Sequence, residues 1–393
     1  MRRALLPALL AFALSAMPSA TPAKTRIAAL PPYSGAYQPQ GVDERGLWGQ
    51  LDDYERTLRD SPIVLRDPAL DAYLRKVLCN TVGTARCDGV RLYLIRAPEI
   101  NASMAPNGMM LIQSGILLRM RSEAELAAII SHEFAHFEER HSLSGFKARR
   151  TVSDIAMWAT LGAIHGGTGA ASIQTSAIGA LFSYQRDQER AADIHGFQYL
   201  AASRYRPGAF ADFWQRMMDE TDATALGRHQ RSTRYDRTVF FATHPTSLER
   251  AGYLKQLAIK DGDDGEDDRT AFDAAMAQWR PAFLSDQLKR NDFGGIEYLL
   301  TQLAGGEWPP DLLLARGDLY RMRNNPRDLV AAAGFYRAAI AAGGTDPLAR
   351  RGLGLALLRT GQPVEGKIAL TDYLTRVPDC DDAAMLRSLI EQP

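Results

Sequence analysis

A helix with a marked beginning organises this sequence. Residues 122–141 read SEAELAAIISHEFAHFEERH. Ser122 followed three residues later by Glu125 forms a capping box, in which each side chain satisfies a backbone amide at the helix start. Apolar residues then recur at the spacing of one buried helix face, namely Leu126, Ile129, Ile130 and Phe137. The pattern predicts a buried helix that runs from Ser122 to about His141.

The same helix carries the pattern HExxH. His132 and His136 are four residues apart, so they stand one above the other on a single helix face and can reach one metal ion. Glu133 projects beside them, where its carboxylate can take a proton from a metal-bound water. Burying these groups among apolar neighbours without a partner would cost free energy, which argues against coincidence. The pattern predicts a zinc site with Glu133 as general base.

A catalytic zinc ion takes three protein ligands and keeps one position for water, so a third ligand must come from elsewhere. Glu189 is the best candidate; alone, it would be interpreted as a surface carboxylate. Asp193 lies one helical turn further on the same face. We expect Asp193 to accept a hydrogen bond from the far nitrogen of a ligating histidine and to help move protons to the leaving amine.

The remaining histidines are less informative. His244 precedes Pro245, which restricts the backbone before it. Such a fixed side chain could stabilise an oxyanion or occupy the open zinc position, and a surface turn explains the pattern equally well. Four others show no partner pattern and are expected to be structural or exposed: His141, His165, His195 and His229.

The N-terminus resembles a targeting segment. Arg2 and Arg3 precede an apolar run, and small residues follow it, so residues 1–23 are predicted to be a cleaved signal peptide. The run is shorter than the ~20 residues that span a bilayer, which disfavours a membrane anchor. Residues 24–45, rich in Pro, Gly, Ala and Gln, are expected to form an extended lead-in.

The charge balance and the three cysteines bear on the ligand class and on the compartment of the protein. The chain has 46 basic and 46 acidic residues, and this balance gives no support for nucleic-acid binding. Cys79 and Cys87 enclose a short loop and are expected to pair in an oxidising compartment, with two free buried thiols as the alternative. Cys380 would then remain unpaired.

Elements around the HExxH helix follow from shorter patterns. Residues 90–95 alternate like a strand. The Asn-Gly pair at 107–108 marks a tight turn, and residues 109–113 after it are expected to form a second strand. Helices are expected over 46–78 and 184–205.

Residues 152–183 raise the question of a membrane span, because they are rich in Ala, Gly, Ile and Leu. The glycines at 166, 167 and 169 break the run, and each half is shorter than a span. We therefore favour two buried helices joined by a turn.

The C-terminal third differs in composition. The acidic segment at 261–269 is predicted to be a solvated linker between domains. Residues 270–393 are expected to be all helical, with spacings that suit tetratricopeptide (TPR) helix pairs at Gly354, Gly361, Gly366 and Pro378. A generic helical bundle is the alternative. The predicted fold is α+β and mostly helical: a zincin-type peptidase domain with a small sheet over 46–260, then an all-α TPR-like domain.

Three motifs together resemble the HtpX/CAAX-protease-like zinc metallopeptidases, which are gluzincins: HEFAH at 132–136, ERAAD at 189–193 and HP at 244–245. The stretch 107–115 also resembles that family. The resemblance implies one zinc per chain, held by His132, His136 and Glu189. It implies Glu133 as the base, Asp193 as a proton donor and His244 as a regulatory histidine that caps the zinc.

The order of signal peptide, peptidase and TPR repeats resembles periplasmic members of that family. We therefore expect a zinc endopeptidase of the bacterial periplasm, free or peripheral to the outer membrane, that cleaves unfolded or misassembled outer-membrane proteins. The strand at 109–113 is expected to pair with an extended substrate. The TPR face is expected to contact the client or the outer-membrane assembly machinery. The alternative functions are a latent zinc-binding TPR chaperone or adaptor, and a scaffold whose HExxH is accidental.

Overall fold

The computed structural model describes residues 39–150, 186–232 and 248–392. The predicted signal peptide, most of the lead-in, the apolar segment 152–183 and His244 lie outside these residues. Among the described helices, none combines the length and apolar character needed to cross a membrane.

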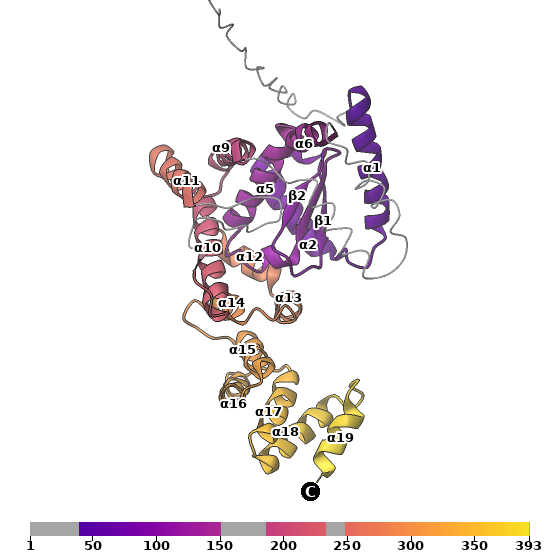
Figure 1. Ribbon diagram of the computed structural model, residues 1–393, viewed down its shortest axis with the longest axis vertical. Coiled ribbons are helices and arrows are strands. Elements are labelled where there is room, and N and C mark those ends of the chain that lie inside the picture. The colour runs from indigo at the N-terminus through magenta and orange to yellow at the C-terminus, as the bar shows by residue number, and fades with distance from the viewer. Residues whose placement is uncertain (1–38, 151–185, 233–247, 393) are drawn as a thin grey trace, which may run out of the picture.

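A small three-stranded sheet lies at the centre of the N-terminal part (Figure 1). Its strands are β1 (Arg91–Ile95), β2 (Ala102–Met104) and β3 (Met109–Gln113), in the order β1-β3-β2. β1 runs parallel to β3, and β2 runs antiparallel to it. β1 and β3 confirm the two expected strands, whereas β2 was not foreseen.

The sheet order corrects one expectation. β3 is the central strand, with its backbone paired to β1 on one side and to β2 on the other. It therefore has no free edge to which a substrate strand could be added. The turn before β3 is as expected, because Gly108 has φ 88° and a Cβ there would lie 2.7 Å from the carbonyl oxygen of Gly89.

Helices cover both faces of this sheet. The N-terminal part contains α1 (Gly41–Arg59), α2 (Pro68–Val82), α3 (Thr84–Cys87), α4 (Ser114–Leu117), α5 (Glu123–Glu138), α6 (His141–Arg150), α9 (Arg186–Ala202), α10 (Ala209–Gly227) and α11 (Leu248–Asp261). Side chains of β3 alternate between two cores: Met110 and Ile112 face the larger one with α2 and α5, and Met109 and Leu111 face a smaller one with α1. The result is a layer of sheet between α1 and the helices that carry the site.

Several boundaries differ from the sequence pattern. Ser122 caps α5 by accepting a hydrogen bond from the backbone N–H of Glu125, as expected. The helix ends at Glu138, three residues earlier than predicted, because Arg140 adopts a left-handed conformation with φ 53°. α1 begins at Gly41, so the last residues of the predicted extended lead-in are helical.

The expected disulfide is confirmed. Cys79 and Cys87 are bonded, with their Cα atoms 5.0 Å apart, and Cys380 is free. The bond ties the end of α2 to α3, and Cys87 is buried in the larger core.

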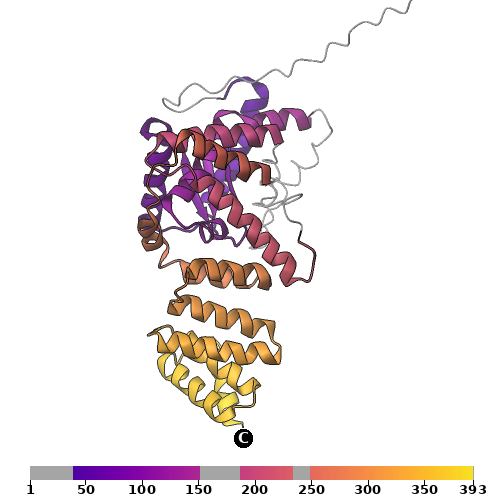
Figure 2. The ribbon, with the colours of Figure 1, turned by 90° about the vertical axis from the view of Figure 1, so that its left-hand side faces the viewer.

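The C-terminal part is wholly helical over its described residues. It contains α12 (Arg269–Met276), α13 (Arg280–Leu288), α14 (Phe293–Ala304), α15 (Pro310–Arg323), α16 (Pro326–Ala341), α17 (Leu348–Arg359), α18 (Pro363–Arg376) and α19 (Ala383–Glu391). From α14 onward the helices stack into a column that leads away from the sheet to the C-terminus (Figures 1 and 2).

The acidic segment at 261–269 does not separate two cores. The larger core continues past it through α12, α13 and α14 as far as Leu319 of α15. The segment is largely exposed, as expected, but it is also tied down. Asp263 accepts a hydrogen bond from the backbone N–H of Gly208, and Arg206 contacts both Asp263 and Asp267. The predicted domain boundary thus falls at a surface turn and not at a break in the packing.

Glycines allow close packing within the column. A Cβ on Gly317 or on Gly352 would lie within 2.6 Å of the ring of Tyr336, which is buried between α15 and α17. A Cβ on Gly354 would meet Leu370. Such contacts suit antiparallel helix pairs, and the assignment of these pairs as TPR repeats stays a prediction.

Candidate metal centre

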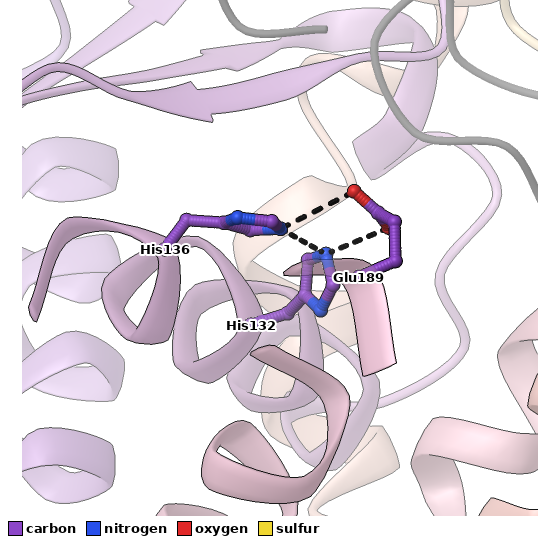
Figure 3. A group of neighbouring side chains, drawn as sticks. All are labelled: His132, His136 and Glu189. Carbon is purple, nitrogen blue, oxygen red and sulfur yellow. Dashed lines mark hydrogen bonds and ion pairs between the residues drawn. The ribbon is translucent and has the colours of Figure 1, made fainter. Parts of the chain in front are cut away.

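The structure brings His132, His136 and Glu189 together (Figure 3). One ligand atom from each residue lies within 4.8 Å of the others. Nε2 of His132 lies 3.6 Å from Oε2 of Glu189, and Nε2 of His136 lies 3.4 Å from Oε1 of the same carboxylate. The two Nε2 atoms are 3.1 Å apart. Three atoms that zinc favours as ligands therefore converge on one point.

Two helices create this convergence. α5 presents both histidines on one face, and α9 lies against it with Glu189 in its first turn. Gly196, two turns beyond Glu189, permits the close approach: a Cβ there would lie 3.0 Å from the backbone nitrogen of His132. Helix geometry thus fixes the histidines, and close helix packing fixes the carboxylate.

The far nitrogen of each histidine also has a partner. Nδ1 of His132 lies 3.0 Å from Oδ1 of Asp193, as the sequence predicts. Nδ1 of His136 lies 2.8 Å from Nδ1 of His141. Because both Nδ1 atoms are engaged, both Nε2 atoms are directed at the shared point, which is the arrangement that a histidine-bound metal requires. Two imidazoles and one carboxylate fit zinc with an open fourth position.

Arg250 is a part of the site that the sequence pattern did not reveal. It lies on α11, is buried, and places Nη1 2.6 Å from Oε2 of Glu189. Its Nε and Nη2 donate hydrogen bonds to the two oxygens of Asp193, each at 2.7 Å. The guanidinium also lies 4.6 Å from the ring centre of Trp214. No sequence spacing signals a pair that is 57 residues apart and depends on how three helices pack.

This arrangement determines charge in the site. Burial alone would raise the pKa of Asp193, but the charge of Arg250 and the contact with His132 outweigh it and lower that pKa to about 2. Burial would lower the pKa of Arg250, and the charges of Asp193 and Glu189 raise it instead. Burial lowers the pKa of His141 to about 4. Asp193 is therefore anionic at neutral pH, and His141 is neutral.

The other predicted residues lie as follows. Glu133 is buried on α5, next to His132 in the sequence and about 100° further around the helix axis. The HExxH spacing predicts that its carboxylate lies near the converging ligands. His244 lies outside the described residues. The described histidines outside the ligand set fit the expectation of structural or exposed residues: His195 is partly exposed, His229 is exposed, and His141 is a buried partner of His136.

Comparison with known proteins places this site in a family. The model of Peptidase family M48 matches residues 65–258, which contain all the residues described above. The beta-barrel assembly-enhancing protease of Yersinia pestis is 27% identical over 195 residues, 46% of this chain and 39% of its own length. A provisionally named Vibrio cholerae homologue of that protease is 31% identical over 189 residues, 46% of this chain and 39% of its own length.

A mitochondrial relative also matches. The mitochondrial metalloendopeptidase OMA1 of Schizosaccharomyces pombe is 31% identical over 194 residues, 47% of this chain and 52% of its own length. The matched part thus spans about half or less of the length of each of these three relatives. The resemblance to metallopeptidases is confirmed, and residues 65–258 form a metalloprotease domain of peptidase family M48.

Proposed function

We propose that this chain is a zinc-dependent endopeptidase that cleaves unfolded or misassembled envelope proteins in the bacterial periplasm, free or peripheral to the outer membrane. The convergence of His132, His136 and Glu189 within 4.8 Å carries the proposal. The names of two bacterial relatives, which refer to β-barrel assembly, support the substrate class. The signal-peptide pattern at residues 1–23 supports the location.

Zinc would be held by Nε2 of His132, Nε2 of His136 and the carboxylate of Glu189. When bound, zinc supplies Lewis acidity, which lowers the pKa of a water in the open position and polarises the scissile carbonyl. One zinc per chain would suffice, since the described residues offer one such group of ligands.

Glu133 would move the proton. Its carboxylate would take a proton from the attacking water and deliver it to the amide nitrogen of the leaving group, so that the carboxylate is regenerated when the peptide bond breaks. Asp193 suits a different role. With a pKa of about 2 and both oxygens bonded to Arg250, it holds no proton to donate at neutral pH. It would instead orient His132.

A substrate chain would pair with β2 in place of β3. β2 is the edge strand next to α5, and among the described residues no strand pairs with its other side. An extended chain bound there would run along the HExxH helix with its backbone amides satisfied. Recognition of backbone more than side chains suits unfolded clients.

The C-terminal helices would supply a second contact for clients or for the outer-membrane assembly machinery. A hollow of about 410 Å³ lies between α13, α15 and the turn before α17. Leu284, Leu314 and Leu348 line it, and its charged lining residues are all acidic: Asp311, Asp318 and Asp346. This lining favours an extended segment that carries apolar and basic side chains.

Cleavage of an unfolded, reduced and alkylated protein tests the proposal. Glu133→Gln should bind zinc as the wild type does and lose nearly all cleavage. Glu139→Gln, a charge removal at the end of the same helix, is the matched control and should keep both. Cleavage that survives in Glu133→Gln would exclude the proposed mechanism.

A further inference from the structure

The turn between α5 and α6 places a second imidazole directly behind a metal-binding histidine. Nδ1 of His141 lies 2.8 Å from Nδ1 of His136, and the two rings meet edge to face with their centres 4.9 Å apart. Both side chains are buried. This contact is as short as a strong hydrogen bond, and it joins the ring nitrogen of His136 that does not face Glu189.

The chain departs from helical geometry to make this contact. In a continuous helix a residue five positions on lies about 140° further around the axis, so His141 would point away from His136. Instead α5 ends at Glu138, and Arg140 takes a left-handed conformation with φ 53°. For a residue other than glycine or asparagine this conformation costs free energy, of order 1 kcal/mol, which the surrounding structure must offset. The reversal returns His141 to the back of the site.

The N-terminal helix supports this turn. Leu143, two residues after His141, packs in the smaller core with Leu47 and Leu51 of α1. Trp48 of α1 lines a small cavity together with His136 and Leu143. α6 lies above the sheet in the view of Figure 1 and contacts α1. The position of His141 is therefore set by packing and not by a mobile surface loop.

Imidazole chemistry gives the contact a direction. A histidine that binds a metal through Nε2 carries its proton on Nδ1, and that N–H needs an acceptor. For His132 the acceptor is the carboxylate of Asp193. For His136 an atom in reach is Nδ1 of His141, at 2.8 Å, which accepts only when its own proton is on Nε2. The two metal-binding histidines would thus be held by two different acceptors, one anionic and one neutral.

We propose that His141 is a positioning residue for the metal site: its Nδ1 accepts the hydrogen bond from Nδ1–H of His136 and so fixes the tautomer and the ring orientation of that ligand. This inference rests on the proposed zinc function. His141 touches neither the metal nor the substrate, and it acts through His136.

A matched pair of substitutions isolates the acceptor. In asparagine the side-chain oxygen occupies the position that Nδ1 occupies in histidine, and in leucine a methyl group occupies it. His141→Leu should weaken zinc affinity by about 10–100-fold, the usual effect of removing a partner of a metal-bound histidine. His141→Asn should keep most of the wild-type affinity. His195→Leu on α9 is the control, since that imidazole contacts Glu138 and Glu139 but no ligand.

The measurement is the zinc dissociation constant of the purified protein by competition with a chelator, with thermal unfolding of the metal-free form alongside. If the role of His141 is purely structural, the substitutions should change the unfolding temperature, but His141→Leu and His141→Asn should bind zinc with the same affinity. Wild-type zinc affinity in His141→Leu, or an equal loss in both variants, would overturn the proposal.

Two further arms keep the outcomes distinct. A wild type that binds no zinc contradicts the proposed function itself, whereas zinc bound by the wild type, lost in His132→Ala and unchanged in His141→Leu contradicts only the role of His141. If His141→Leu does not fold, His141→Gln replaces it. The side-chain carbonyl of glutamine lies one methylene further from the backbone than that of asparagine, so it does not occupy the position of Nδ1. Cobalt(II) bound in place of zinc gives an absorption spectrum that reports the ligand geometry. If the absorption bands of His141→Leu or His141→Gln are shifted from those of the wild type and of His141→Asn, His141 has the proposed role. Unshifted bands oppose it.

Discussion

Arg250 bridges two carboxylates of the site, with Nη1 2.6 Å from Oε2 of Glu189 and Nη2 2.7 Å from Oδ1 of Asp193. All three side chains are buried. Like charges buried side by side repel, and the guanidinium between the two carboxylates offsets this repulsion. It also joins α11 to α9, which makes the metal site part of the packing between these helices.

Replacing Arg250 should therefore destabilise the metal-free protein. Arg250→Met keeps much of the volume and removes the charge, and it should lower the free energy of unfolding by about 3–5 kcal/mol, as expected when a buried ion pair loses one partner. Urea unfolding of the metal-free form measures this change. Arg250→Lys keeps the charge and should recover part of the loss. A change below about 1 kcal/mol in the methionine variant would show that the bridge matters little.

The contact between α5 and α9 should be sensitive to one added methyl group. Gly196→Ala places a Cβ 3.0 Å from the backbone nitrogen of His132. The helices must move apart, so zinc affinity should fall and the free energy of unfolding should drop by about 1–3 kcal/mol.

Gly252→Ala on α11 is the control for the glycine substitution, because a Cβ there meets nothing within 4 Å. It should stabilise the protein by about 0.5–1 kcal/mol through helix propensity and leave zinc affinity unchanged. Equal zinc affinities for Gly196→Ala and Gly252→Ala would show that close approach at Gly196 does not position Glu189.

The docking of α1 should depend on pH through Glu55. Its carboxylate accepts two hydrogen bonds from Arg91, at 2.5 and 2.6 Å, and others from Tyr93 and Asn107. Burial raises the pKa of Glu55, but these contacts outweigh it and hold that pKa below its ordinary value of 4.5. The unfolded chain therefore binds the proton more readily, and the stabilisation present above pH 4.5 is lost as the pH falls below it.

Glu55→Gln tests this dependence. The variant should be less stable than the wild type at pH 7, and the difference should shrink as the pH is lowered below about 4.5. Denaturant unfolding at several pH values measures it. If the difference in free energy of unfolding between the two proteins stays constant down to pH 3, the contacts of Glu55 do not lower its pKa in the folded protein.

Local patterns predicted the parts of the fold that depend on nearby residues. The capping box at Ser122, the tight turn at Gly108 and strand β3 each follow from a few adjacent side chains, and the structure contains all three. The HExxH spacing gives the geometry of His132 and His136 for the same reason, because one helix sets it. The disulfide between Cys79 and Cys87 could be predicted for a similar reason, because only eight positions separate the two residues.

What the sequence did not predict depends on tertiary packing. The partners Arg250 and His141 are brought in by helix packing and by a left-handed turn, and neither leaves a spacing pattern. The place of β3 at the centre of the sheet depends on β2, which has only three residues and no clear alternation. The acidic segment 261–269 marks a composition change, but the buried faces of the following helices continue the same core.

Zinc content per chain shows whether His132, His136 and Glu189 form a metal centre. It should be measured on the purified wild type and on His136→Ala, each after reconstitution and removal of loosely bound metal. We expect about one zinc in the wild type and little in the variant, with both proteins folded. A wild type without zinc, or equal zinc in both proteins, would contradict a metal centre formed by His132, His136 and Glu189.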